Sequence, residues 1–229
     1  LGRPALAMTA MKNIKTSWLS REALALALYT NGLVLLIALY FFEANQKFRF
    51  IVELLVFGAG VYGIYAQSMI YRIKARPSWN KKETTNIFFY VGYIGLFLIT
   101  FMLMLNGNYS SASVLLPLAI FVGFLQYMEF SKEVDFYKTL SNEHKNFYQL
   151  NKTKILYETN FIKLRDYRRN SIFVGAFILP ILSMLFLASN NYNYAITTIF
   201  IAIAISFSSE IVSRLLFYKT AVSLGLAGN

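Results

Sequence analysis

The sequence predicts an all-α protein, a polytopic bundle of six membrane-spanning helices. Of its 229 residues, 57% are hydrophobic and only 14% are charged, whereas a soluble domain usually has about 25% charged residues. The mean hydropathy of +0.49 points the same way. Six separate stretches also have the length of about 20 apolar residues that a helix needs to cross a bilayer.

The predicted spans follow one another in order along the chain. The first two carry one acidic residue each near their starts, Glu22 and Glu53, and the third and fifth carry no charged residue. The fourth closes with Gln126 and Glu129, and the sixth has charged residues in its last turns. The six spans cover roughly 22–42, 50–71, 86–105, 112–130, 171–189 and 193–216.

We expect residues 1–229 to form one integral membrane domain, with 131–170 as a polar surface segment within it. This segment mixes nine Lys and Arg residues with apolar pairs at 155/156 and 161/162, which roughly follow helical spacing. Two interpretations stay open: an amphipathic helix in contact with anionic membrane lipid, or a docking surface for a soluble partner. Neither requires nucleic acid, and we expect none as a partner.

The basic residues gather on one face of the predicted bundle. Alternating connections place 20 of the 22 Lys and Arg residues on that face and leave only Lys47 and Arg49 on the other. The positive-inside rule assigns such a face to the cytoplasm.

The sequence offers few ligands for metals. It has no cysteine and a single histidine, His144, in the most polar stretch. Disulfides, thiolate-bound zinc and iron–sulfur clusters are therefore excluded within this chain, and so is a haem held by two histidines. We expect no metal or haem here.

Ionisable residues inside spans are expensive and are functional candidates by default. Glu210 and Arg214 are four residues apart, so they share a helix face and can form a structural ion pair. Glu22 follows Ser20, a plausible N-cap, and the helix dipole would then favour its carboxylate. Gln126 and Glu129 are the other polar candidates. For Glu22, dipole complementation and proton acceptance both stay open on spacing alone.

The segment LGRPALAMTAMKNIKTSWLSRE, residues 1–22, resembles the signature of the dimethyl sulfoxide reductase anchor-subunit family. Members of that family read approximately His-Leu-Gly-x-Pro, then a short loop, then Ser-Trp-Leu-Ser-Arg-Glu. The segments MIYRIKARPSWN (69–80) and SSEIVSRLLFYKTAVSLGLAG (208–228) resemble later parts of the same family. The matching residues of the first motif are Leu1, Gly2, Pro4, Ser17, Trp18, Leu19, Ser20, Arg21 and Glu22.

The resemblance implies an eight-helix fold of which this chain holds the third to eighth helices. We therefore expect the sequence to start inside a longer protein, with the family's motif histidine just before Leu1. It also implies a three-subunit oxidoreductase of anaerobic respiration in the bacterial cytoplasmic (inner) membrane. Its partners would be a molybdopterin catalytic subunit and an iron–sulfur subunit with four [4Fe–4S] clusters.

In such a complex, this chain would exchange electrons with menaquinol or ubiquinol. The resemblance ties Glu22 to quinol binding, and we interpret it as the proton acceptor. Arg21 and Trp18 are candidate pocket or docking groups, and Gln126, Glu129, Glu210 and Arg214 are possible supporting polar groups.

Other functions stay open. The SWLSRE segment is also similar to that of the membrane subunit of a cytoplasm-facing sulfite dehydrogenase, and the basic face agrees with a cytoplasmic partner. Dimethyl sulfoxide reductases hold their catalytic subunits in the periplasm, so the terminal substrate and the sidedness are both undecided. A transporter is the rival from another class, although paired Gly/Pro interruptions in two halves are not visible. A purely structural assembly anchor is the remaining alternative.

Overall fold

The computed structural model describes residues 13–222, and every regular element in that range is helical. Six segments are long and apolar enough to cross a membrane, which confirms the predicted all-α architecture with six spans. Each begins before the predicted apolar stretch because the helix continues into the polar residues that flank it. The motif matches at Leu1, Gly2 and Pro4 lie outside the described residues. The six spans are Trp18–Phe41, Gln46–Tyr71, Lys82–Leu105, Tyr109–Lys138, Ile162–Ala188 and Tyr192–Lys219.

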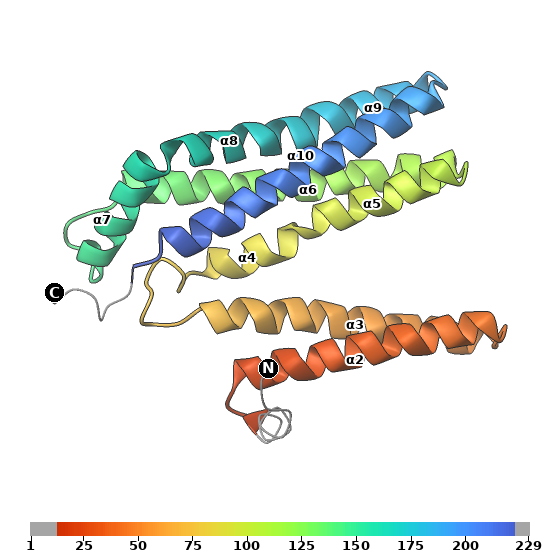
Figure 1. Cartoon of the computed structure of the whole chain (residues 1–229), viewed down its shortest axis with the longest axis horizontal. Coiled ribbons are helices and arrows are strands. Elements are labelled where there is room, and N and C mark those ends of the chain that lie inside the picture. Colours follow the sequence, from red (N-terminus) through yellow and green to blue (C-terminus); the bar gives the residue numbers. More distant parts are fainter. Residues whose placement is uncertain (1–12, 223–229) are drawn as a thin grey trace. The chain divides into compact units, whose positions relative to one another are not determined.

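The chain divides into two compact units, Leu1–Ile73 and Lys74–Asn229. In the first, α2 (Trp18–Phe41) and α3 (Gln46–Tyr71) form an antiparallel hairpin (Figure 1). The Asn45 side chain caps α3 by accepting a hydrogen bond from the backbone N–H of Lys47 at 2.9 Å. The two helices approach closely at Gly32, where an added Cβ would lie 2.4 Å from Val56 Cγ2. Small residues of this kind allow membrane helices to pack backbone to backbone.

Helix α2 begins one turn earlier than the sequence predicts. Its N-cap is Ser17, whose Oγ accepts a hydrogen bond from the backbone N–H of Ser20 at 3.4 Å. The prediction of Ser20 as the cap is therefore wrong, because Ser20 is a buried residue of the first turn. Glu22 becomes the fifth residue of the helix. It lies beyond the first turn, to which the helix dipole is largely confined, so dipole complementation explains its presence less well.

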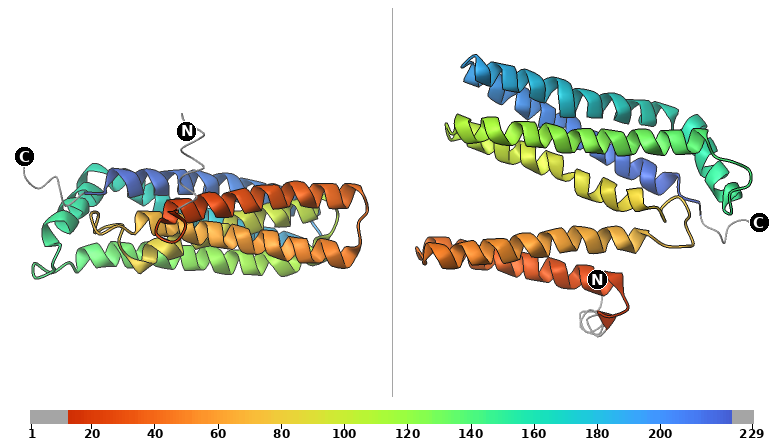
Figure 2. Two further views of the ribbon diagram at one scale, coloured as in Figure 1. Left: turned by 90° about the horizontal axis from the view of Figure 1, so that it is seen from below. Right: turned by 180° about the vertical axis from the view of Figure 1, so that it is seen from behind.

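In the second unit, four antiparallel spans pack in a ring, each against its two neighbours (Figure 2). The first span is α4 followed by α5, the second is α6, the third is α8 continued by a π-helical turn η3 and by α9, and the fourth is α10. Their bounds are α4 (Lys82–Tyr90), α5 (Gly92–Leu105), α6 (Tyr109–Lys138), α8 (Ile162–Phe173), η3 (Val174–Ile178), α9 (Leu179–Ala188) and α10 (Tyr192–Lys219).

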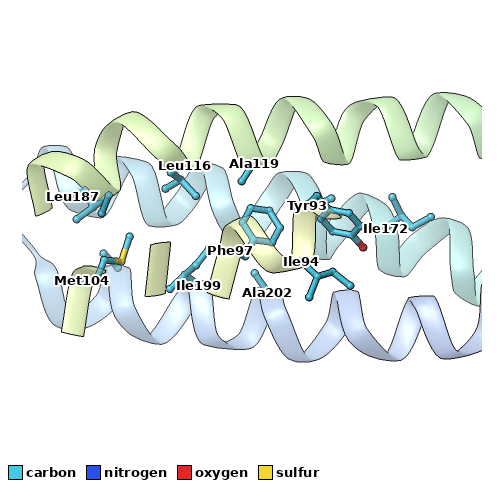
Figure 3. Packing of buried hydrophobic residues seen from close by; sticks show 13 residues of the cluster. Tyr93, Ile94, Phe97, Met104, Leu116, Ala119, Ile172, Leu187, Ile199 and Ala202 are labelled. Carbon is cyan, nitrogen blue, oxygen red and sulfur yellow. The ribbon is translucent and has the colours of Figure 1, made fainter. Parts of the chain in front are cut away.

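The core of this unit alternates large and small side chains across the ring. Tyr93 and Phe97 are fully buried with their rings edge to face, 5.6 Å apart. Figure 3 shows Ala119 and Ala202 at the same level, from the helices on either side. The helices are close because a Cβ on Gly123 would lie only 2.8 Å from the Cβ of Ala176.

The π-helical turn η3 interrupts the third span of this unit just before Pro180. Proline has no N–H to donate to the carbonyl four residues earlier, here Ala176, and its ring crowds that carbonyl. A local widening of the helix is the usual way to absorb such a break.

The polar segment 131–170 is mostly helical and packs on the bundle. It comprises the end of α6, the connection 139–146, α7 (Phe147–Ile155), the π-helical turn η2 (Leu156–Asn160) and the start of α8. Leu150 and Tyr157 are buried in a cluster with Tyr137 and Leu216, at the ends of α6 and α10. Burial raises the pKa of the Tyr157 phenol, and the neighbouring Glu133 adds to this increase. Part of the apolar surface of this segment thus faces protein, whereas Tyr148, Ile155, Ile162 and Tyr167 stay exposed.

Candidate functional site

A groove runs along the α2–α3 hairpin and contains the principal predicted site residue, Glu22. Its volume is about 510 Å³, and its walls are mainly apolar. Glu22 lies near the start of α2 and Gln67 near the end of α3, so the antiparallel pairing brings both polar side chains to the same end of the groove. Tyr29 lies further along it. The lining residues are Glu22, Ala25, Leu26, Tyr29, Phe57, Ala59, Gly60, Val61, Gly63, Ile64 and Gln67.

Two glycines of α3 shape this groove. A Cβ on Gly60 would lie 3.2 Å from the ring of Tyr29, and a Cβ on Gly63 would lie 3.5 Å from the Cβ of Ala25. Because Gly60 has no side chain, the ring of Tyr29 can pack against the backbone of α3 along the wall of the groove. An elongated, mostly apolar groove with a few polar groups at one end is typical of sites for amphipathic small molecules.

Trp18 and Arg21 are close to Glu22 in sequence but are not among the residues that line the groove. Arg21 Nε donates a hydrogen bond to the carbonyl oxygen of Ile14 at 2.8 Å, and its Nη2 donates to that of Lys15 at 2.7 Å. The guanidinium also lies 4.2 Å from the ring centre of Trp18, which packs edge-on against Tyr65. Through these hydrogen bonds, Arg21 links the segment before α2 to the helix that carries Glu22.

In the second unit, Gln126 and Glu210 meet inside the bundle. Gln126 Nε2 donates a hydrogen bond of 2.9 Å to Glu210 Oε1, linking α6 to α10, and both side chains are buried. The spacing predicts Arg214 as the partner of Glu210, whereas the structure gives Glu210 a partner on another helix. The Arg214 guanidinium lies over the ring of Phe88, 3.9 Å from its centre. Glu129 is paired with Lys132 at 2.8 Å along α6.

A second cavity, of about 300 Å³, lies at the end of this unit that carries the basic connections. Lys81, Glu83, Glu133 and His144 are among its lining residues. Burial lowers the pKa of Lys81, while the carboxylates of Glu133 and Glu83 oppose the change. Its ammonium group lies 3.7 Å from the ring centre of Phe136, a favourable position for a partly desolvated cation.

The structure brings together two sequence motifs that are about 130 residues apart. Trp79, in the segment 69–80, stacks on Phe217, in the segment 208–228, with ring centres 4.8 Å apart and planes 5° from parallel. The Arg76 guanidinium lies over the ring of Trp79, 4.1 Å from its centre. Both motifs therefore contribute to one structural contact at the basic end of the second unit.

Among residues 13–222, no group of three or more His, Cys, Asp or Glu side chains is arranged to hold a metal ion. His144 lies in the connection before α7, where its Nδ1 accepts a hydrogen bond from the backbone N–H of Asn146 at 3.2 Å.

Several residues of these sites escape prediction from the sequence. Tyr29 and Gln67 line the groove, and Tyr93 and Arg168 are buried in the second unit, but none of them interrupts an apolar pattern strongly enough to stand out. The glycines at 60 and 63 were the available signal for a close helix approach in α3.

One comparison with known proteins gives a match. The model of the family described as DMSO reductase anchor subunit (DmsC) matches residues 1–220, nearly the whole chain. No curated protein and no solved structure matches.

Proposed function

The chain belongs to the DMSO reductase anchor subunit family, and from that membership we propose that it carries electrons between the membrane quinone pool and an iron–sulfur subunit. Its six apolar helices make it a multi-pass membrane protein. As a family member it is the membrane anchor subunit of a DMSO reductase-type complex. The quinone chemistry, the site residues and the individual partners are the proposal.

The observation that carries the proposal is the position of Glu22 at one end of the α2–α3 groove. A quinone has a flat ring with two oxygens and an apolar tail, and the groove offers polar side chains at one end and apolar walls along its length. Glu22 is the acidic residue among the lining residues, and Gln67 adds an amide that can donate a hydrogen bond.

Oxidation of a quinol releases two electrons and two protons. In this proposal Glu22 accepts the proton of one quinol hydroxyl, which is the role of a general base within hydrogen-bond reach, and the proton of the other hydroxyl is released to water. The electrons pass to the nearest cluster of the iron–sulfur subunit and then to the molybdopterin subunit. Arg21 is a positioning residue here, because its hydrogen bonds to Ile14 and Lys15 hold the start of the helix that presents Glu22.

We further propose the bacterial cytoplasmic membrane as the location, with the basic end of the bundle in the cytoplasm. The charge distribution supports this orientation, since 20 of the 22 Lys and Arg residues belong to connections on that side. A partner on the same side would then face the cytoplasm, as in the sulfite dehydrogenase type of complex. The terminal substrate stays open between sulfoxides or other S- and N-oxides and sulfite.

The test is Glu22→Gln in the intact complex. The amide keeps the size and hydrogen-bonding capacity of the side chain but cannot accept the proton. Quinol-dependent turnover should be lost, while assembly and the dye-dependent activity of the soluble subunits stay normal. Glu53→Gln is the matched control, because Glu53 lies at the other end of the same hairpin, where Tyr40 donates a hydrogen bond to it.

Normal quinol-linked rates in Glu22→Gln would leave Glu22 with a structural role only. Purification in mild detergent tests the partners, since an iron–sulfur subunit should accompany the chain. Absence of any such partner would favour the transporter alternative. Assembly with full dye-dependent activity but no quinol-linked activity in the parent complex would identify a purely structural anchor.

A further inference from the structure

A cluster of polar side chains lies deep inside the second unit, apart from the groove. Tyr93, Gln126, Arg168, Ser206 and Glu210 come from four different spans, and none is more than 6% exposed. Glu210 is nine residues from the end of α10, or about 14 Å along the helix axis at 1.5 Å per residue. Figure 3 shows the oxygen of Tyr93 among the apolar side chains that pack around it.

Most of the hydrogen-bonding capacity of this cluster is unused. Apart from the bond between Gln126 and Glu210, Gln126 Oε1 and Glu210 Oε2 have no partner with hydrogen-bond geometry among the described residues. The same holds for the hydroxyls of Tyr93 and Ser206 and for Arg168 Nε and Nη2, although Ser206 lies near enough to Tyr93, and Arg168 to Tyr157, for their side chains to interact. A buried polar atom left unpaired destabilises the folded state. The usual solution in proteins is a buried water that makes several hydrogen bonds to such atoms.

The polar side chains of the cluster are near neighbours. Ser206 lies near enough to the Tyr93 phenol to act on it through its hydroxyl, and Glu210 and Arg168 lie near enough to act on it by their charges. Gly175, in the π-helical turn η3, keeps the third span close to Ser206, because a Cβ there would lie 2.7 Å from Ser206 Oγ. Single π-helical turns inside helices are frequent at functional sites.

Polar groups continue from this cluster towards the basic end of the unit. Arg168 Nη1 lies 3.7 Å from Glu133 Oε2, and Glu133 lines the 300 Å³ cavity together with Lys132 and His144. The hydroxyl of Ser209, next to Glu210, donates a hydrogen bond to the backbone carbonyl of Arg168 at 3.3 Å. The series Glu210, Arg168, Glu133 therefore leads from the bundle interior to a cavity at its end.

We propose that the cluster of Tyr93, Gln126, Ser206 and Glu210 holds internal water, and that Glu210 exchanges a proton through this water with Glu133 and the cavity at the basic end. Only a proton moves, so no oxidant or reductant is required. The site is separate from the α2–α3 groove, and the inference does not depend on quinone chemistry there.

Hydroxyl-radical footprinting of the full-length chain in its complex tests the water. Radicals formed by radiolysis of water modify aromatic rings that have a water molecule beside them. Tyr93 and Phe97 provide a matched pair, since both lie on α5 one turn apart and both are 0% exposed. Tyr93 should be modified several times faster than Phe97. Equal and slow modification of the two rings would overturn the proposal.

Infrared spectroscopy tests the proton. The carboxyl signal of Glu210, identified by its loss in Glu210→Gln, should shift within minutes of transfer to D₂O. Glu210→Gln retains an amide oxygen for the bond from Gln126, which favours normal folding. Glu133→Gln should slow the shift. A Glu210 band that stays unshifted in the folded protein, or no band lost in Glu210→Gln, would exclude proton exchange at this site.

Discussion

The indole Nε1 of Trp79 donates a hydrogen bond of 2.8 Å to the backbone carbonyl oxygen of Phe217, the same residue on whose ring it stacks. Phe217 lies in the last turn of α10, where backbone carbonyls have no partner within the helix. The tryptophan therefore completes the end of α10 from a connection 138 residues earlier in the chain.

Replacement of Trp79 by phenylalanine should destabilise the second unit. Phenylalanine can keep part of the stacking but loses the hydrogen bond to the carbonyl oxygen of Phe217, which contributes about 0.5–1.5 kcal/mol. The measurement is the thermal unfolding midpoint in detergent, which should fall by several degrees. An unchanged midpoint would mean that water replaces the indole N–H without loss.

Gly60→Val should block the α2–α3 groove, because the added side chain occupies the space next to the ring of Tyr29. If the groove holds quinone, the KM for quinol should rise roughly tenfold, equal to about 1.4 kcal/mol, while the dye-dependent activity stays normal. Gly58→Val is the control, since nothing lies within 4 Å of a Cβ at Gly58 in the same helix. Equal kinetics in the two variants would place the quinone elsewhere.

Lys81 should make stability depend on pH in the alkaline range. Its pKa is lowered in the folded protein, chiefly by burial, from an ordinary value of 10.5. Between the lowered and the ordinary pKa the unfolded chain binds more protons than the folded one, so the free energy of unfolding rises with pH up to about 10.5. Lys81→Met should remove this rise, as measured by denaturant unfolding across that interval.

Lys82→Met is the control for this measurement, because Lys82 is adjacent in sequence and exposed. It should keep the rise seen in the parent. The difference between the two variants is the informative quantity. A parallel pH dependence in both would show that Lys81 is not the group responsible.

Reporter fusions should place the basic end of the bundle in the cytoplasm. The connection 139–146 and the turn 106–108 lie at opposite ends of α6, and both are outside the helices. A periplasmic phosphatase should be active at Asn108 and inactive in 139–146, with the reverse result for a fluorescent reporter that requires the cytoplasm. Phosphatase activity in 139–146 would assign the basic end to the periplasm.

The spans and the family could be predicted from the sequence for physical reasons. A bilayer demands about 20 apolar residues per helix, and this requirement is local, so the six stretches are visible without any knowledge of packing. The SWLSRE segment is likewise contiguous. The start of α2 was misplaced because Ser17 and Ser20 are both good N-caps, and only the backbone conformation distinguishes them.

The tertiary structure decided which polar side chains interact with one another inside the membrane-spanning bundle. Spacing along one helix favours Arg214 as the partner of Glu210, yet α6 brings Gln126 within 2.9 Å of it. The positions of Tyr93 and Arg168 next to Ser206 and Glu210 depend equally on the ring of four spans. The sequence by itself determined which residues enter the membrane, because hydrophobic length is a property of each segment. Which polar side chains meet inside the membrane was determined only by the packing of one helix on another. Such contacts join residues far apart in the sequence, so no single segment reveals them.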